Sequence, residues 1–422
     1  MMRIQRPITL HQPRKLAFGC GCAGELAADL HQRGLRRVFV VTSPPTAGLV
    51  AHALEPRPLG EGQGEDGKAG PVAGTPAPAS WGAHRPGPLP EREVSSQPLD
   101  VMIWDRVTAE PGIDTLRAAL ATAREARPDA VVGLGGGSAM DVAKLVAALL
   151  DGKQDVRGVL GIGKLAGRGT WLACLPTTAG TGSEVSPNAI LLDEADQLKK
   201  GVISPHLVPD AAYVDPMLTL GVPPAVTGAT GMDALTHCIE AYANRYAHAL
   251  IDLYALEGIR LIARGLPRAF DDGNDIEART QVALGSLYGG LCLGPVNTGA
   301  VHALSYPLGG EFHIAHGVAN AVLLPHVLEF NLPAAPDRYA AIAQALGARD
   351  SGDAMQVAQR GLRILRELAA RCGIPPRLSD LGIPRDAIDR MARSAMTVTR
   401  LLRLNVRPVT IEDALGIYRR AM

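Results

Sequence analysis

The sequence has little that would suit it to nucleic acid or to a membrane. Its 42 lysines and arginines balance 42 aspartates and glutamates, so there is no basic excess with which to bind nucleic acid or an anionic membrane surface. No apolar run reaches the ~20 residues of a membrane-spanning helix, and the N-terminus has no long apolar segment typical of a signal peptide. We therefore expect a cytoplasmic protein with no nucleic acid or membrane partner.

Cysteine is also scarce. Six cysteines in 422 residues do not make a disulfide framework. Cys20 and Cys22 form a Cys-x-Cys pair, but no second pair follows at the spacing of metal ligands. We interpret all six as reduced thiols, in agreement with a cytoplasmic location.

Hydrophobic residues, in contrast, make up 47% of the chain, and its length favours two domains. Residues 1–216 alternate strand and helix patterns, which predicts an α/β Rossmann-like domain that binds a dinucleotide. Residues 217–422 predict an all-α domain with the metal and substrate site. Its helices are expected to begin at Pro223-Pro224 and to continue at about 247–264, 275–293, 297–305, 316–330, 336–346, 353–372, 385–397 and 410–421, with Thr410 as the last N-cap.

A glycine-rich turn follows a predicted buried strand at 129–134. Gly136, Gly137 and Ser138 lead into a helix at 139–150, and Ser138 would be its N-cap. Glycines let the backbone approach a pyrophosphate, and a helix N-terminus presents free N–H groups to it. The turn is not the Gly-x-Gly-x-x-Gly fingerprint, however, and many such turns only pack a strand against a helix.

Two further segments suit a nucleotide. Ser43 follows the apolar strand 37–42, at the edge of the sheet where ligands of open α/β folds bind. A loop at 176–184 is rich in hydroxyls that could contact phosphate or nicotinamide, although a polar turn before a strand is the alternative. These hydroxyls belong to Thr177, Thr178, Thr181 and Ser183. Residues 188–192 and 199–204 then predict a β-hairpin.

Residues 56–97 differ in composition from everything around them. Proline, glycine, alanine and serine dominate there, and too few aliphatic residues occur to offset the entropy of ordering the chain. We expect a flexible surface loop without chemistry; a partner-binding loop is the alternative.

The helical half contains a pair of metal-binding side chains. Asp233 and His237 stand four residues apart on a predicted helix, so they share one face. His302 and His316 add two imidazoles downstream, and a carboxylate with three imidazoles is a ligand set for Fe²⁺, Zn²⁺ or a similar ion. A buried, hydrogen-bonded histidine is the alternative at each position.

Two segments of this half resemble the signatures of the iron-containing (group III) alcohol dehydrogenases, whose fold is like that of dehydroquinate synthase. They are Gly-Met-Asp-Ala-Leu-Thr-His-Cys-Ile-Glu-Ala-Tyr and Val-His-Ala-Leu-Ser-Tyr-Pro-Leu-Gly-Gly-x₅-His-Gly-Val-Ala-Asn-Ala. In the first half, Gly-Gly-Gly-Ser-Ala-Met-Asp-Val-Ala-Lys resembles the family's phosphate-binding turn. The resemblance extends from about Leu16 to the C-terminus, interrupted by the insert.

The resemblance implies a full set of metal ligands and a nicotinamide cofactor. The ligands are Asp233, His237, His302 and His316, and the ion is Fe²⁺, Zn²⁺ or another divalent metal. NAD or NADP would bind at the glycine-rich turn, whose motif includes Asp141, along the 176–184 loop and near Lys199. In the family the position of Ser43 often carries an aspartate that discourages a 2′-phosphate, so this serine does not exclude NADPH.

One position departs from the family. Many members carry a second histidine four residues after the equivalent of His302, as a proton relay beside the substrate, and here that position is Tyr306. A phenol with its ordinary pKa near ~10 is a poorer shuttle at neutral pH. His313 lies close in sequence and is the alternative relay.

These features predict a metal-dependent, NAD(P)-linked alcohol dehydrogenase, in practice an aldehyde, ketone or keto-acid reductase, whose metal acts as a Lewis acid in hydride transfer. Its partner would be a small alcohol or aldehyde, and a homodimer or higher homo-oligomer is expected. The alternatives are a maleylacetate-reductase-like or glycerol-dehydrogenase-like enzyme of the same fold, and a non-catalytic protein with a structural metal.

Overall fold

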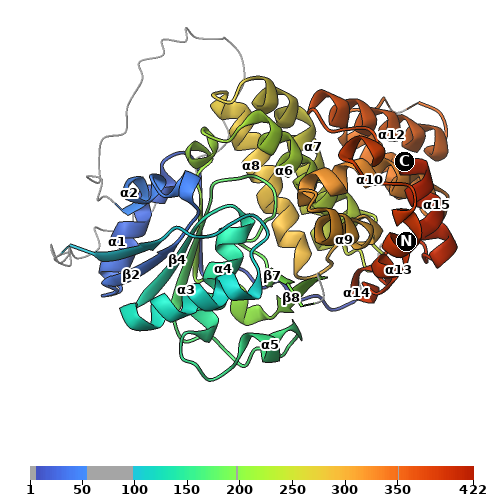
Figure 1. Ribbon diagram of the computed structural model, residues 1–422. Helices are drawn as coiled ribbons and strands as arrows, with labels where there is room; N and C mark the ends of the chain where they lie inside the picture. Colours follow the sequence, from blue (N-terminus) through green and yellow to red (C-terminus); the bar gives the residue numbers. More distant parts are fainter. Residues whose placement is uncertain (1–5, 55–97, 196–197, 350) are drawn as a thin grey trace, which may run out of the picture.

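An α/β part and a helical part lie side by side in the computed structural model, which describes residues 6–54, 98–195, 198–349 and 351–422 (Figure 1). The fold class predicted from the sequence is confirmed. The insert expected at 56–97 lies outside the described residues. Within the described ranges, no helix combines the length and the apolar character that crossing a membrane requires.

The α/β part is built on a parallel sheet of six described strands in the order β1-β9-β6-β4-β2-β3. The strands are β1 (Lys15–Phe18), β2 (Arg37–Val41), β3 (Asp100–Trp104), β4 (Ala130–Gly135), β6 (Trp171–Pro176) and β9 (Ala211–Val214). The chain adds β3 on one side of β2, then returns to β4 and continues in the opposite direction. Ligands of open α/β sheets bind at the carboxyl ends of the strands beside such a reversal, which here places the loops after β2 and β4 at the expected position.

Helices cover both faces of this sheet. Val38 and Val40 pack with the helices on one face, α1 and α2, whereas Phe39 and Val41 pack with α3 and α4 on the other. This alternation is the two-residue period of a strand whose two faces are both buried. The helices are α1 (Glu25–Gln32), α2 (Leu49–Leu54), α3 (Ile113–Ala126), α4 (Gly137–Leu149) and the short α5 (Val156–Val159).

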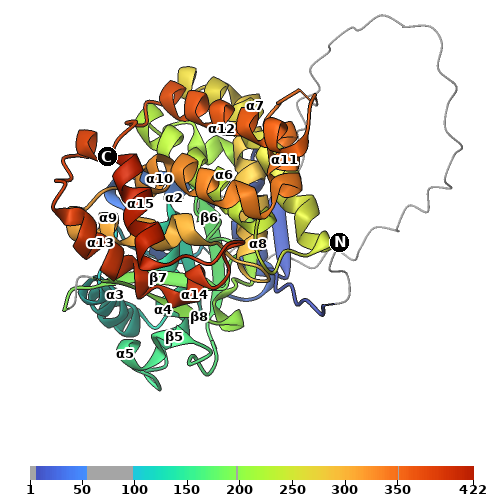
Figure 2. The same cartoon turned by 90° about the vertical axis from the view of Figure 1, so that its right-hand side faces the viewer.

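A second, three-stranded sheet extends the α/β part towards the helices. Its strands are β5 (Gly161–Ile162), β7 (Asn188–Asp193) and β8 (Leu198–Ile203), and the antiparallel pairing of β7 with β8 confirms the predicted hairpin. In both views this hairpin lies beside α9 and α14 (Figures 1 and 2).

The helical part confirms the helices predicted from the sequence, including the start after Pro223 and the cap at Thr410. They are α6 (Pro224–Tyr242), α7 (Ala249–Asp271), α8 (Ile276–Leu293), α9 (Ala300–Phe312), α10 (His316–Asn331), α11 (Pro336–Ala345), α12 (Ala354–Arg371), α13 (Ala387–Met396), α14 (Thr399–Leu402) and α15 (Ile411–Ala421). The predicted ends of α7 near 264 and of α9 near 305 were wrong, because these helices continue through Pro267 to Asp271 and through the buried Pro307 to Phe312. In each helix, apolar packing outweighs the hydrogen bond that a proline removes.

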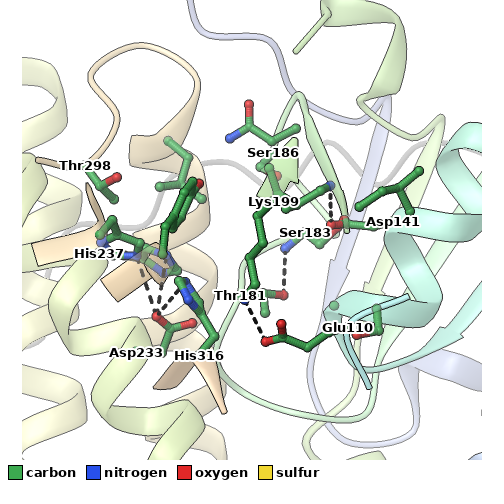
Figure 3. Close-up of a pocket in the computed structure, with 18 of the residues that line it drawn as sticks. Glu110, Asp141, Thr181, Ser183, Ser186, Lys199, Asp233, His237, Thr298 and His316 are labelled. Carbon is green, nitrogen blue, oxygen red and sulfur yellow. Dashed lines mark hydrogen bonds and ion pairs between the residues drawn. The ribbon is translucent and has the colours of Figure 1, made fainter. Parts of the chain in front are cut away.

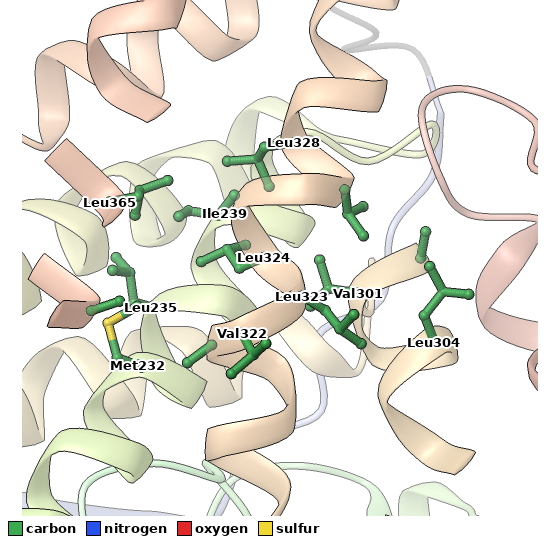
Figure 4. Close-up of a cluster of buried hydrophobic side chains, with 14 of the residues drawn as sticks. Met232, Leu235, Ile239, Val301, Leu304, Val322, Leu323, Leu324, Leu328 and Leu365 are labelled. Carbon is green, nitrogen blue, oxygen red and sulfur yellow. The ribbon is translucent and has the colours of Figure 1, made fainter. Parts of the chain in front are cut away.

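A continuous hydrophobic core fixes α6, α9 and α10 relative to one another. Figure 4 shows its side chains pointing inward from these helices, among them Met232 on α6, Val301 on α9 and Leu323 on α10. The helical part also packs on the sheet. A Cβ atom at Gly182, in the loop after β6, would lie 2.3 Å from the Gly290 Cα of α8, so only a glycine permits this contact between the two parts.

Candidate metal and nucleotide site

One face of α6 carries three polar side chains in an otherwise apolar environment. Asp233, His237 and Glu240 occupy positions i, i+4 and i+7, which align along a helix, and all three are buried. Asp233 and His237 point towards α9 and α10 (Figure 3). The predicted helix pair therefore forms, and it lies inside the protein rather than on its surface.

Three imidazoles converge on the carboxylate of Asp233. Its Oδ1 atom lies 3.9 Å from Nε2 of His237, 3.6 Å from Nε2 of His302 and 3.8 Å from Nε2 of His316. Ligand atoms of Asp233, His237 and His302 all lie within 4.8 Å of one another. The structure thus brings together all four side chains that the sequence indicated as metal ligands.

Close helix packing makes this convergence possible. Gly317, the second residue of α10, approaches α6 so closely that a Cβ atom there would lie 2.2 Å from the carbonyl oxygen of Ala229. On the other side, a Cβ at Gly289 of α8 would lie 3.2 Å from Cβ of His237. These contacts hold His316 and His237 at the distances given above.

Glu240 orients one of the imidazoles. Its Oε2 atom accepts a hydrogen bond of 2.6 Å from Nδ1 of His302, and its Oε1 accepts one of 2.7 Å from the backbone N–H of Val301. A proton on Nδ1 leaves the Nε2 lone pair of His302 free and directed at Asp233. Metal-binding histidines are commonly oriented by a carboxylate in this way.

Two further polar residues of the cluster, Glu240 and Asn320, were not predicted from the sequence. Asn320 is fully buried on α10, and its amide nitrogen lies 2.7 Å from Oδ1 of Asp233 and 3.2 Å from Nε2 of both His302 and His316. Helical spacing could have identified both residues, because Asn320 stands four residues after His316 and Glu240 seven after Asp233.

Burial and neighbouring charges shift the pKa values of the cluster in different directions. Burial alone would raise the pKa of Asp233, but the neighbouring histidines hold that pKa well below its ordinary value. Burial lowers the pKa of His237, and it lowers the pKa of His316 to about 3. Burial would also lower the pKa of His302, but hydrogen bonds to Asp233 and Glu240 raise it to about 9. The ionised carboxylate of Asp233 therefore favours a positive charge beside it, such as a protonated imidazole or a metal cation.

The residues present fit a divalent cation. Three imidazole nitrogens and one carboxylate oxygen suit Fe²⁺, Zn²⁺ and related ions. The Nε2 atoms of the three histidines surround Oδ1 of Asp233 at 3.6 to 3.9 Å. A buried carboxylate in this position is costly unless positive charge lies beside it, which a cation bound by these atoms would supply.

A cavity of about 180 Å³ lies between the cluster and the α/β part. Its helical wall contains the four candidate ligands together with Thr298, Tyr306 and Arg400. Its α/β wall contains Gly137, Ser138, Asp141, Thr181, Ser183, Lys199 and Glu110. Figure 3 shows the two groups facing each other across the opening.

The α/β wall includes the N-terminus of α4. Gly136, not Ser138 as predicted, is the N-cap, and among the described residues no side chain caps the first N–H groups of the helix. The extended backbone of Gly136 takes the cap position, which moves Ser138 into the first turn. A Cβ at Gly137 would lie 2.5 Å from Cγ2 of Thr181, so the turn after β4 and the loop after β6 are in close contact.

Two acidic groups of this wall have firm partners. Asp141 accepts hydrogen bonds from the hydroxyl of Ser183 at 2.5 Å and from the backbone N–H of Ile190 at 2.9 Å. Glu110, which was not predicted from the sequence, lies 2.6 Å from Nζ of the nearly buried Lys199. Its backbone has a φ of 54°, an uncommon conformation for a residue other than glycine.

The remaining predicted residues do not line the cavity. Thr177 is buried, and its N–H donates to the carbonyl of Gly135. Thr178 lies against Gly136, 3.4 Å from where a Cβ there would be. Ser43 begins a turn whose Thr46 side chain approaches Gly135, so it lies beside the glycine-rich turn.

The two alternative relays differ in position. Tyr306 lines the cavity, its ring centroid 6.3 Å from that of His316. His313 is exposed, has left-handed backbone at the end of α9 and does not line the cavity.

The sequence matches two family descriptions, "Iron-containing alcohol dehydrogenase" over residues 91–216 and "Fe-containing alcohol dehydrogenase family, C-terminal" over residues 227–422. It is 41% identical over 325 residues to long-chain-alcohol dehydrogenase 1 of Geobacillus thermodenitrificans (strain NG80-2), which covers 76% of this chain and 82% of that protein. It is 33% identical over 409 residues to lactaldehyde reductase of Escherichia coli (strain K12), and this match covers 96% of this chain and 97% of that protein. The crystal structure of a 1,3-propanediol oxidoreductase superposes with a TM-score of 0.86 at 30% identity, covering 99% of this chain and 100% of that one.

These matches extend over both parts of the molecule, and the resemblance noted in the sequence is confirmed. Members of the matched family bind a divalent metal ion and NAD(P). The chain belongs to the iron-containing alcohol dehydrogenase family and is an oxidoreductase.

Proposed function

We propose that the cavity is the active site of a metal-dependent, NAD(P)-linked alcohol dehydrogenase that also reduces aldehydes or ketones. The supporting observation is that one cavity joins two different kinds of wall. The cluster of Asp233 and three histidines lies on one side, and the free N-terminus of α4 with the hydroxyls of the β6 loop lies on the other. A metal site and a nucleotide site that share an opening suit hydride transfer.

The proposed metal ligands are Asp233, His237, His302 and His316. When bound, the divalent ion would act as a Lewis acid that favours loss of the alcohol proton and, in reverse, polarises a carbonyl group. Glu240 and Asn320 would hold the ligands, the first through Nδ1 of His302 and the second through Oδ1 of Asp233. Metal analysis would determine whether the bound ion is iron or zinc.

The proposed cofactor contacts follow the α/β wall. The N–H groups of Gly137 and Ser138 at the start of α4 would bind the pyrophosphate. Thr181, Ser183 and Lys199 border the part of the cavity that faces the metal cluster, where the nicotinamide would meet the substrate. Thr177 and Thr178 would support these turns from behind, Asp141 would border the cavity beside Ser183, and Ser43 would lie at the adenine ribose.

Tyr306 is the better-placed proton relay. Burial raises its phenol pKa, although the charge and hydrogen bond of Arg400 oppose this. The phenol therefore keeps its proton near neutral pH and can donate from Oη to the oxygen formed when a carbonyl is reduced. Tyr306→Phe should lower the rate of reduction, whereas His313→Asn should not. The reverse result would assign the relay to His313.

Metal analysis of the purified protein, followed by aldehyde reduction with NADH and NADPH side by side, tests the function. We expect about one divalent ion per chain, oxidation of the cofactor seen at 340 nm, and loss of turnover after chelation with recovery on adding metal. Full turnover in metal-free protein would contradict the proposal, and would instead favour a maleylacetate-reductase-like enzyme. The other alternative is a non-catalytic protein with a structural metal. Such a protein would show no turnover and would not need this cavity beside its metal site.

The cellular location and the oligomeric state remain predictions. All six cysteines are free in the structure, which suits the cytoplasmic location we propose. A homodimer or higher homo-oligomer is proposed as well. Light scattering coupled to size-exclusion chromatography would give the mass to compare with the 44.2 kDa of one chain.

A further inference from the structure

The charged side chains that line the cavity are unequally neutralised. Lys199 is paired with Glu110, and Asp141 receives two hydrogen bonds with the buried Lys144 at 3.9 Å. Asp233 lies among three histidines. Arg400 is different: within the described part of the chain, no carboxylate lies at ion-pair distance from its guanidinium.

Arg400 also lies on the substrate side of the cavity. It belongs to the short helix α14, which packs against α9 and lies beside the β7–β8 hairpin (Figures 1 and 2). Its guanidinium is 3.5 Å from the hydroxyl of Tyr306. Among the described residues, the guanidinium makes no other hydrogen bond. Because Tyr306 stands one helical turn after His302, a single phenol side chain separates Arg400 from the metal cluster.

A half-buried cation without a counter-charge is costly, and a ligand that supplies the charge would remove that cost. A guanidinium presents a planar fork of N–H donors that matches the two oxygens of a carboxylate. We propose, building on the function above, that Arg400 binds the carboxylate of the substrate and that the preferred substrates are short-chain aldehydes or ketones bearing a carboxylate. Such a substrate would accept a hydride from NAD(P)H at its carbonyl carbon and one proton at its oxygen, and leave as a hydroxy acid.

The geometry limits the length of this substrate. The ring of Tyr306 is centred 6.3 Å from that of His316, and its hydroxyl points to Arg400. Because Arg400 contacts the same hydroxyl that would donate the proton, the carboxylate and the carbonyl of the substrate must lie close together. An extended chain advances about 1.2 Å per bond, so a substrate of about four or five carbons has a suitable length. The cavity of about 180 Å³ has room for a molecule of this size beside the nicotinamide edge.

A matched pair of aldehydes tests the proposal with the metal-loaded protein. The pair is 4-oxobutanoate and butanal, which have the same number of carbons and differ in the carboxylate. We expect the wild-type protein to have the higher kcat/KM for 4-oxobutanoate. Arg400→Met should lower the ratio of the two kcat/KM values about 30-fold, which corresponds to about 2 kcal/mol, and Arg400→Lys should lower it less. Any effect through Tyr306 acts on both aldehydes and cancels in this ratio.

Arg403→Met is the matched control, because Arg403 is the exposed C-cap of the same helix and does not line the cavity. The ratio should stay at the wild-type value in this variant. Succinate, which cannot be reduced, gives a readout without turnover. It should raise the thermal midpoint of the wild-type protein and of Arg403→Met, but not of Arg400→Met.

The outcomes separate the two proposals. Equal kcat/KM for both aldehydes in the wild-type protein would overturn the role of Arg400 and leave the proposed function intact. A loss shared equally by both aldehydes, with weaker binding of NADH, would assign Arg400 to the cofactor and overturn the proposal as well. Turnover of neither aldehyde with either cofactor would overturn the proposed function, and the role of Arg400 with it.

Discussion

The helical wall of the cavity is built from side chains, whereas the α/β wall is built largely from backbone. The four candidate metal ligands come from three helices, and the imidazoles of His237, His302 and His316 meet at one carboxylate oxygen of Asp233. Across the opening, the turn after β4 and the loop after β6 present glycines, free N–H groups and hydroxyls. Each wall uses the groups that its proposed ligand requires, because a cation needs lone pairs and a pyrophosphate needs N–H donors.

This difference determines how each wall can be damaged. On the helical wall, removal of a side chain removes a ligand or its support. On the α/β wall, removal of a side chain matters less than addition of one, since Gly137 and Gly182 lie where a Cβ atom would collide with a neighbour. Substitutions of the two kinds should therefore affect metal retention and cofactor binding separately, which four experiments can test.

The largest effect is expected from His302→Ala. The substitution removes an imidazole that lies 3.6 Å from Asp233 and leaves the Oε2 atom of Glu240 buried without its partner. Metal retention and turnover should be lost together, with the metal measured by mass spectrometry of the purified protein. His313→Asn is the control, because His313 is exposed and outside the cavity and because asparagine tolerates left-handed backbone. Full turnover of a metal-free His302→Ala protein would contradict the proposed site.

Glu240→Gln should weaken the metal site without abolishing it. The glutamine can still accept from the N–H of Val301, but its amide can no longer accept a charge-assisted hydrogen bond from Nδ1 of His302. Loss of such an orienting carboxylate typically costs about 10- to 100-fold in metal affinity. Competition with a chelator would measure this change. Glu311→Gln, at an exposed position of α9, should leave the affinity unaltered.

Gly137→Ala should damage the other wall. The added Cβ would lie 2.5 Å from Cγ2 of Thr181, so one of the two turns must move. We expect NADH binding, followed by its fluorescence, to weaken about tenfold, or roughly 1.4 kcal/mol, while the metal content stays constant. At Gly158 of α5 a Cβ meets nothing within 4 Å, which makes Gly158→Ala the control. Loss of metal with unaltered NADH binding would show that the two walls are not separable.

The two walls also differed in how far the sequence predicted them. Asp233 and His237 were accessible because both lie on one helix, where spacing alone indicates a shared face. The same reasoning could not choose between Tyr306 and His313. Both positions would face the same side of an ideal helix, but α9 ends at Phe312 and His313 turns away in the left-handed region. The end of a helix depends on packing that a local pattern does not contain.

Other features needed contacts between distant segments. Arg400 reaches the cavity because α14 packs on α9, and nothing in the residues around it indicates this position. Glu110 depends on a rare backbone conformation and on a partner 89 residues away. The error at Ser138 has a local cause, since a glycine can take the extended cap position that serines often occupy.

The smallest effect is expected at the ribose end of the α/β wall. Ser43 follows β2, and its hydroxyl lies 2.9 Å from that of Thr46, whose side chain approaches Gly135. A seryl hydroxyl can accept a ribose hydrogen bond but does not repel a 2′-phosphate. The wild-type protein should therefore discriminate weakly between NADH and NADPH, within about tenfold in kcat/KM, or ~1.4 kcal/mol.

Ser43→Asp would place a negative charge beside that phosphate and should depress the use of NADPH selectively, through repulsion across a short distance. Ser43→Asn has a similar shape without the charge and should keep the wild-type ratio of NADPH to NADH turnover. Because this position lies away from the metal cluster, both variants should retain their metal. A thousandfold preference of the wild-type protein for NADH, or an equal loss with both cofactors in Ser43→Asp, would show that the ribose does not bind at Ser43.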